Sequence, residues 1–140
     1  MALPDAVSEG RFIGYTTSST TVQILPGRIV EFDSSGDIVI PTTTPIVDQI
    51  AGVTASKVAA RTTATKENIL VQVTGVAHVL CTANEGFTIG RLVRAGVLGI
   101  ATTAVAQTTI TATALAACIG KVVTPDATTE GTTVAIRLTL

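Results

Sequence analysis

One short phrase, a glycine and an arginine followed by two aliphatic residues, occurs twice in this chain, at Gly27–Val30 and again at Gly90–Val93. A further glycine comes nine residues after the first glycine of each copy, at Gly36 and Gly99. Two later apolar runs recur in the same order, so that four landmarks repeat at offsets of 63 to 69 residues. Such self-similarity is typical of a fold built from like units that pack on one another. We therefore expect two half-units that share one core.

The residue types favour β-structure. Of 140 residues, 26 are threonine and four are aromatic, and charged residues make up 14%, against about 25% in an average soluble domain. Branched side chains are restricted at χ1 and fit the pleated surface of a sheet better than a helix. A length of 140 residues is enough for one domain with its own core. We therefore predict an all-β fold in a single domain.

The charge balance limits the partners that this chain is expected to bind. The net charge is −1 and the sequence pI is about 5.7, so nothing favours nucleic acid, which binds basic surfaces. The mean hydropathy is +0.56, and a surface with so few charges is suited to lying against protein. We therefore predict an oligomer or a docked subunit, with no nucleic-acid partner.

The glycines of the repeat predict turns rather than a ligand site. Glycine adopts positive φ angles without steric cost, and each glycine of the repeat lies next to a short apolar run. The sequence contains neither a GxGxxG motif nor a Walker motif. We therefore expect no cofactor.

Residues Ile69 to Cys81 alternate between apolar and polar side chains, which predicts one strand with its odd-numbered side on a core. His78 and Cys81 are the one pair here that could suggest a nucleophile and its base. Residues three apart in a strand point to opposite faces, so this pair forms no dyad. Cys81 and Cys118 are expected to be buried thiols. We predict no catalytic residue and no metal ligand, and hence no enzyme.

The longest uncharged stretch, residues 95–120, is flanked by basic residues and is long enough to cross a bilayer as a helix. This stretch contains six threonines and the three glycines Gly96, Gly99 and Gly120, whereas a spanning helix is dominated by large aliphatic residues. We therefore expect no membrane partner. The first residues, Met1–Asp5, lack a basic region followed by an apolar one, which predicts synthesis in a reducing cytoplasm.

The chain divides into an N-terminal arm, residues 1–21, and a β domain, residues 22–140. The arm contains three large apolar side chains, Phe12, Ile13 and Tyr15, which favour an extended segment that orders on a neighbouring subunit over a solvated tail. In the domain, turn residues alternate with short β-branched runs. The expected half-repeats are residues 22–80 and 85–140, and the expected strands are 22–25, 28–32, 38–40, 50–57, 69–81, 90–95, 97–102, 117–123 and 133–140, with residues 108–116 open between strand, loop and short helix.

The order of these glycine-aliphatic phrases resembles the capsid cement, or head decoration, proteins of tailed bacteriophages. The resemblance covers residues 22 to 140 and consists of spacing rather than a catalytic motif. Its phrases are Pro26–Val30, Ile50–Thr54, Ile69–Ala77, Ile89–Val93, Ile119–Val122 and the C-terminal strand that ends at Leu140.

This resemblance implies a small β-barrel or β-tulip fold and a structural role in the virion. A protein of this kind binds the outer surface of an expanded icosahedral capsid as a homotrimer and clamps neighbouring major capsid subunits against the pressure of packaged DNA. The partners implied are the major capsid protein and further copies of the same chain. Two half-repeats set the chain apart from a lambda-type decoration protein. The interface residues expected from the arm and from the two repeat arginines are Leu3, Pro4, Phe12, Ile13, Tyr15, Arg28 and Arg91.

The main alternative is a carbohydrate-binding or fibre-like adhesion module, because threonine-rich β domains with few charges also serve that purpose. Sugar rings stack on aromatic side chains, and the chain has only four aromatic residues and no tryptophan. The composition therefore favours the capsid hypothesis over adhesion.

Overall fold

The computed structural model describes residues 10–17, 23–43, 49–60, 66–81, 87, 89–103, 118–123 and 133–140. Within these ranges the strands form two five-stranded sheets whose strand pairings are all antiparallel. The all-β prediction is confirmed. The strands are β1 (Phe12–Thr17), β2 (Ile29–Phe32), β3 (Ile38–Val39), β4 (Ile50–Thr54), β5 (Glu67–Gln72), β6 (Val76–Leu80), β7 (Leu92–Ala95), β8 (Ala101–Thr103), β9 (Cys118–Val122) and β10 (Thr133–Leu138), with a 3-10 turn at Val97–Gly99.

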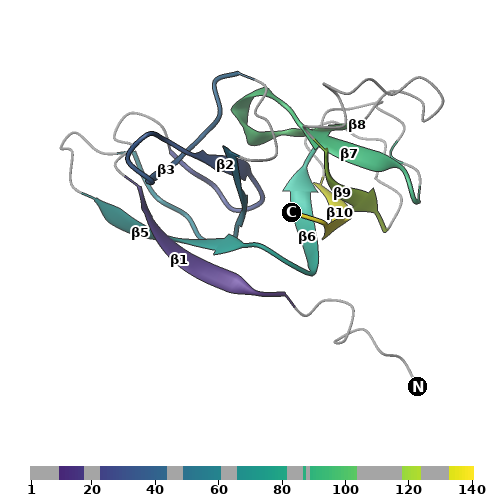
Figure 1. Cartoon of the computed structure of the whole chain (residues 1–140), viewed down its shortest axis with the longest axis horizontal. Helices are drawn as coiled ribbons and strands as arrows, with labels where there is room; N and C mark the ends of the chain where they lie inside the picture. The colour runs from purple at the N-terminus through teal and green to yellow at the C-terminus, as the bar shows by residue number, and fades with distance from the viewer. Residues whose placement is uncertain are drawn as a thin grey trace.

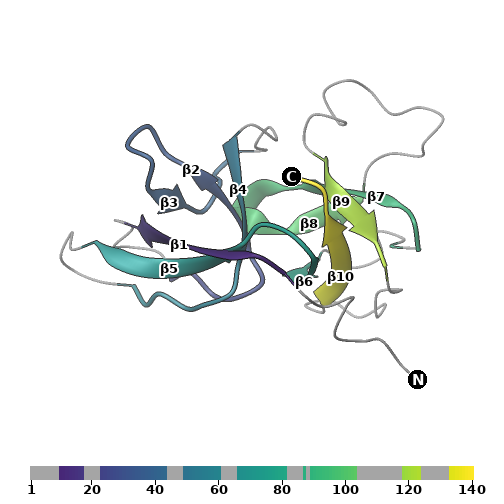
Figure 2. The same ribbon diagram turned by 60° about the horizontal axis from the view of Figure 1, so that its bottom comes forward.

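The two sheets have the same topology. The strand order is β1-β5-β4-β2-β3 in the first sheet and β6-β10-β9-β7-β8 in the second, so adding five to each strand number of the first gives the second. Figure 1 shows the two units side by side, β1 to β5 in one and β6 to β10 in the other, and Figure 2 shows the same separation from a second direction. The repeat in the sequence is therefore a repeat in the fold.

The expected boundaries of the half-repeats are corrected by the sheet topology. β1 belongs to the first sheet and β6 to the second, so the equivalent units run from Phe12 to Gln72 and from Val76 to Leu138. The single strand predicted over residues 69–81 is two strands in different sheets. Gly75, which has a φ of 86°, turns the chain between them without interrupting the alternation of apolar residues that suggested one strand.

Irregularities in the sheets repeat as well. The pairing of β2 with β4 shifts register between Val30 and Glu31, and the pairing of β7 with β9 shifts between Val93 and Arg94, 63 residues later in each case. A β-bulge bends a strand and increases its twist. Both sheets therefore curl at the same place.

Gly52 and Gly120 occupy equivalent positions opposite these bulges. A Cβ atom at Gly52 would overlap the carbonyl oxygen of Gln72, and one at Gly120 would overlap that of Arg137. Each carbonyl belongs to the neighbouring strand of its own sheet. Glycine is therefore required in both units because β4 and β9 approach the backbone of β5 and β10 too closely for any side chain.

Each sheet curls until its first strand approaches its third, which gives two small barrel-like units. In the first unit, the Thr17 hydroxyl donates a hydrogen bond of 2.7 Å to the carbonyl oxygen of Ile38. At the equivalent place in the second unit, Cys81 and Ala101 form a parallel β-bridge. The same closure is therefore made by a side chain in one unit and by backbone in the other.

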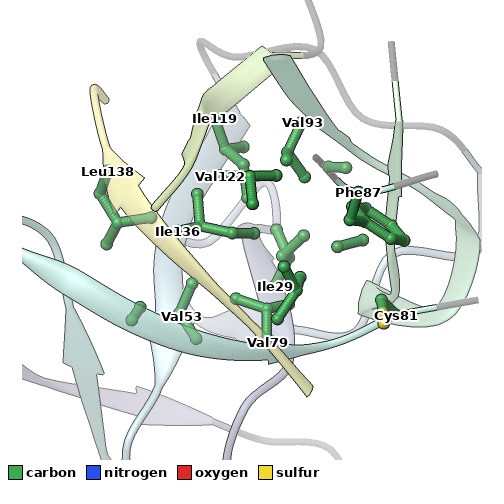
Figure 3. Packing of buried hydrophobic residues seen from close by; sticks show 14 of the residues in the cluster. Ile29, Val53, Val79, Cys81, Phe87, Val93, Ile119, Val122, Ile136 and Leu138 are labelled. Carbon is green, nitrogen blue, oxygen red and sulfur yellow. The ribbon is translucent and has the colours of Figure 1, made fainter. Parts of the chain in front are cut away.

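The buried apolar residues form two clusters rather than the one shared core that the sequence predicted. The first cluster lies inside the first sheet and includes Val30, Ile38 and Val71. The second lies inside the second sheet and also takes in three residues from the opposite face of the first sheet (Figure 3). Two cores arise because each sheet encloses its own interior. The three residues that link the halves are Ile29, Ile50 and Val53.

The N-terminal arm prediction is corrected for residues 12–17. These residues form β1 and pair with β5 over six consecutive positions within the same chain. Their apolar side chains and alternating burial complete the first sheet, so they need no neighbouring subunit in order to fold. Residues 1–9 and 18–21 of the predicted arm, and residues 104–117 with their open strand or helix assignment, lie outside the described residues.

Candidate interaction surfaces

The residues that could suggest catalysis lie apart. His78 is exposed on β6, whereas Cys81 is buried with 3% of its surface accessible, and the two point to opposite faces as the alternation predicts. Cys118 is half-buried, and burial raises the pKa of its thiol, an effect that the nearby Arg94 partly offsets. Among the described residues, no three histidine, cysteine or acidic side chains gather as metal ligands would.

The structure describes only part of residues 95–120, the uncharged stretch that is long enough to cross a bilayer as a helix. Within the described ranges, the structure contains no helix with the length and apolar character needed to cross a bilayer. Residues 95–103 of that stretch form the end of β7, the 3-10 turn and β8.

Three of the four aromatic rings serve to pack the fold. Tyr15 and Phe32 form an edge-to-face pair with ring centroids 5.2 Å apart at the margin of the first core, and Phe87 is 3% exposed in the second. Phe12 is 47% exposed. The chain therefore presents one aromatic ring to solvent rather than a platform of several.

Phe12 is part of an apolar patch on the outer face of the first sheet. Residues opposite one another in antiparallel strands point to the same side, and Gly14 lies opposite Leu70, which is 40% exposed. Because Gly14 has no side chain, nothing on β1 separates Phe12 from Leu70. The half-buried Ile13 lies opposite the buried Val71 and points toward the first core. The expected interface residues Leu3 and Pro4 lie outside the described residues.

Arg28 and Arg91 take equivalent places, each directly before the second strand of its unit. The Arg28 carbonyl accepts a hydrogen bond of 2.8 Å from the N–H of Thr54, and the Arg91 carbonyl accepts one of 3.0 Å from the N–H of Val122. Both arginines are half-buried. Their surroundings differ, because Arg28 lies at the junction between the two units.

At the junction, the contact surface of the first unit is not equivalent to the contact surface of the second unit. The N–H of Leu80 donates to the carbonyl oxygen of Gly27 at 3.0 Å, and the N–H of Leu98 donates to that of Pro41 at 2.9 Å. Gly99 packs so closely on the backbone of Ile29 that a Cβ atom there would overlap it. Ile29 itself is fully buried. The junction is thus a close apolar contact edged by backbone hydrogen bonds.

The charged side chains that the structure describes differ in sign between the two units, although over the full sequence the net charge is −1 for residues 12–72 and +1 for residues 76–138. In the described part of the second unit every charged side chain is basic, and Lys121 and Arg137 lie opposite one another on one face. In the described part of the first unit four acidic side chains accompany three basic ones. The basic residues of the second unit are Arg91, Arg94, Lys121 and Arg137, and the acidic residues of the first are Glu31, Asp33, Asp37 and Glu67.

The fold is that of a duplicated β-barrel-like module with a packed interior and exposed apolar side chains on the first sheet. No model of a known protein family matches the chain, and no curated protein matches it. One solved structure with a similar fold is the crystal structure of the head fiber gp8.5 N base of bacteriophage phi29. The similarity covers 92% of this chain and 95% of that one, with a TM-score of 0.56 and 16% sequence identity. At this identity the similarity shows a common fold.

Proposed function

We propose that this protein is a structural component of a tailed-bacteriophage head, attached to the capsid and without enzymatic activity. The observation that carries the proposal is the similarity of almost the whole chain to a base domain described as part of a phage head fiber. The phage head was also the assignment favoured by the spacing of the sequence phrases. Two independent lines of argument, one from sequence rhythm and one from fold, therefore favour the same class of protein.

The finer proposal is that the protein binds the outer surface of the expanded shell as a homotrimer and clamps neighbouring major capsid subunits. Its candidate contact with the capsid is the patch formed by Phe12 and Leu70, to which the sequence prediction adds Leu3 and Pro4. Apolar side chains that are exposed together contribute binding free energy when a partner covers them. The chain continues from this patch directly into the segment that the sequence assigned to an arm.

The clamp acts through number rather than through strong single contacts. Packaged DNA pushes the capsid subunits apart, and a trimer that bridges several of them must detach before they separate. Linked contacts raise the overall affinity far above that of one contact, and many bridges in parallel slow the rupture of the shell. A rigid all-β module is suited to this task because its surfaces keep a fixed relative geometry.

The test uses purified protein and expanded capsids from a phage that lacks the gene for this protein. Saturable binding and a higher temperature of capsid rupture are expected. The variant Phe12→Ser/Leu70→Ser should weaken binding at least tenfold, whereas Leu140→Ser, which also removes an exposed leucine side chain, should bind like the parent. Absence of parental binding would refute attachment to the capsid.

A deletion tests the contribution of the first residues. Removal of residues 1–9 leaves β1 intact, because β1 begins at Phe12. The truncated protein should keep its melting temperature and bind capsids more weakly. Unchanged capsid binding would exclude Leu3 and Pro4 from the contact. Binding of the parent protein to a glycan array would instead favour the adhesion alternative, for which the structure offers a single exposed aromatic ring.

A further inference from the structure

The junction is formed by one surface of the first unit and a different surface of the second unit. Each of these two surfaces has an equivalent in the other unit that takes no part in the junction. The first unit contributes Gly27 and Ile29 to the junction, and their equivalents in the second unit are Gly90 and Leu92. The second unit contributes the edge of β6 at Leu80 and the turn at Gly99. The equivalents of that second side are the edge of β1 at Thr16 and the turn at Gly36. We call the surface around Gly90, Arg91, Leu92 and Lys121 the tail surface, and the edge of β1 with the Asp33–Asp37 turn the head surface.

Both surfaces are open in the single chain. A Cβ atom added at Gly90 or at Gly36 would meet no atom of the described residues within 4 Å, whereas Gly27 and Gly99 lie against the backbone of the other unit. Leu92 is half-exposed, although its equivalent Ile29 is fully buried. Within the described part of the chain, each kind of surface is therefore used once at the junction and its second copy is left uncovered.

The head surface also presents hydrogen-bonding groups at the edge of a sheet. The N–H of Val73 donates to the carbonyl oxygen of Arg11, so in the antiparallel register every second residue from Arg11 onward directs its backbone groups toward β5. Gly14 and Thr16, which fall between those residues, direct their backbone groups away from β5. Such an edge binds an additional chain through main-chain hydrogen bonds.

The charges of the two surfaces are complementary. The junction places Arg28 beside the turn of the other unit, since a Cβ atom at Gly99 would lie 3.3 Å from the Arg28 Cβ. The same contact between two chains would place Arg91 beside Gly36, in a turn that contains Asp33 and Asp37. The Asp37 carboxylate is buried, accepts a hydrogen bond from the Thr16 hydroxyl and pairs with Lys66 at 3.0 Å, so Asp33 is the carboxylate that Arg91 of the next copy approaches. Such a pair of opposite charges helps to set the register.

We propose that the tail surface of one copy docks on the head surface of a second copy with the geometry of the junction within the chain. The N–H of Thr16 then donates to the carbonyl oxygen of Gly90 in the next copy, as Leu80 donates to Gly27. Leu92 becomes buried as Ile29 is. This inference rests on the self-association in the proposed function and supplies its contact surfaces. A head-to-tail contact closes into a ring when its rotation permits and otherwise extends into a filament.

Cysteine crosslinking of the full-length protein tests this geometry. In a disulfide the two Cβ atoms lie about 3.5–4.5 Å apart, close to the separation that the junction predicts for positions 36 and 91. The variant Gly36→Cys/Arg91→Cys should form covalent multimers under mild oxidation and return to a single band on reduction. The parent chain and each single variant are the controls and should form no ladder. A ladder that ends at three chains supports a closed trimer, and one that continues indefinitely would exclude the ring.

A charge exchange keeps the proposal testable if cysteine at Gly36, where φ is 82°, disturbs the turn. Arg91→Glu should weaken self-association at least tenfold by analytical ultracentrifugation, and adding Ser35→Lys in the head surface should restore it. Lys57→Glu makes the same change of charge at an exposed position outside both surfaces and should have no effect. A monomeric parent protein, or a loss that Ser35→Lys fails to restore, would overturn the proposal.

Capsid binding is measured separately on the same variants. If the parent protein binds capsids but sediments as a monomer of 14.2 kDa, the head-to-tail inference fails and capsid attachment stands. If it forms the crosslinked trimer but does not bind capsids, the inference stands and the proposed function fails.

Discussion

The two halves of this molecule have the same strand order but differ in whether the outer face of the sheet is buried. In the first half, Ile29 and Val53 on the outer face are buried against the second half. Their equivalents, Leu92 and Lys121, are half-exposed and exposed. The backbone plan is therefore independent of which face is covered. The side chains on the outer face are apolar where the other half packs on it, and they are a mixture of apolar and charged residues where the other half does not.

The comparison also separates the residues that shape each sheet from the residues that hold the two halves together. The bulges and the glycines at Gly52 and Gly120 occur in both halves because they shape each sheet. The three linking residues are buried, whereas their equivalents in the second half are half-buried at Leu92 and Cys118 and exposed at Lys121. Four substitutions test this division, ordered from the largest expected effect to the smallest.

The largest effect is expected at the glycines that both halves share. Gly120→Ala places a Cβ atom on the carbonyl oxygen of Arg137 and should reduce the free energy of unfolding by about 4 kcal/mol, because β9 must move away from β10. Urea denaturation followed by circular dichroism measures this change. Gly52→Ala should cost a similar amount. Gly14→Ala, where a Cβ atom meets nothing within 4 Å, is the control, and an equal loss there would contradict the steric argument.

The next effect separates the covered face from the open one. Ile29→Ala should cost about 3 kcal/mol because it removes a fully buried side chain from the junction. Leu92→Ala, at the equivalent position, should cost less than about 1 kcal/mol at protein concentrations low enough to keep chains apart. Chemical denaturation of dilute samples provides both values. Equal costs would mean that the two faces are covered alike.

A third effect tests how the first half anchors its first turn. The Thr54 hydroxyl donates to the Leu25 carbonyl at 2.7 Å and accepts from the Arg28 N–H at 2.9 Å, whereas its equivalent in the second half is Val122. Thr54→Val should cost about 2 kcal/mol because the carbonyl and the N–H of two part-buried hydrogen bonds lose their partner. Thr54→Ser keeps the hydroxyl and should recover most of the loss in the same urea titration. A neutral Thr54→Val would mean that the first half needs this anchor no more than the second.

The smallest effect concerns pH. Burial raises the pKa of Glu31 above its ordinary value of 4.5, so the folded state binds this proton more tightly than the unfolded state. Stability from this group is therefore gained as pH falls through the raised pKa and is absent at neutral pH. Glu31→Gln should be slightly more stable than the parent near pH 7, with the difference shrinking toward pH 4.

Urea midpoints at the two pH values measure the effect of Glu31. Glu67→Gln removes one negative charge from an exposed position of the same sheet and controls for net charge. A stability difference that grows toward low pH would contradict the sign derived for Glu31. Arg94 holds the equivalent position in the second half, so the effect belongs to the first half alone.

Much of the fold could be predicted because its signals are local. Threonine and valine content indicated sheet, and Asp33 to Asp37 indicated a hairpin turn, which the hydrogen bond from the Asp33 N–H to the Asp37 carbonyl confirms. The boundary at Gly75 could not be predicted, because the alternation of apolar residues passes through it unbroken. The assignment of Phe12–Thr17 to an arm failed for a related reason: the partner strand β5 lies more than 50 residues further along the chain.

The candidate interaction surfaces were predictable only in part. Arg28 and Arg91 were expected in equivalent places, and their backbone contacts are equivalent. The sequence grouped Phe12 with Tyr15, yet Tyr15 packs on Phe32 while Phe12 points outward. Phe12 and Tyr15 are three residues apart and face opposite sides once the segment is a strand. Which of the two sides is buried depends on the pairing of that strand with β5.

By itself the sequence determined that the chain is built twice from the same β plan, because glycines, turns and β-branched runs act within a few residues of their own position. Only the tertiary structure decided where one unit ends, which face of each sheet is covered, and that the interior divides into two cores. These outcomes depend on contacts between residues far apart in the chain, and no local preference of the backbone contains them.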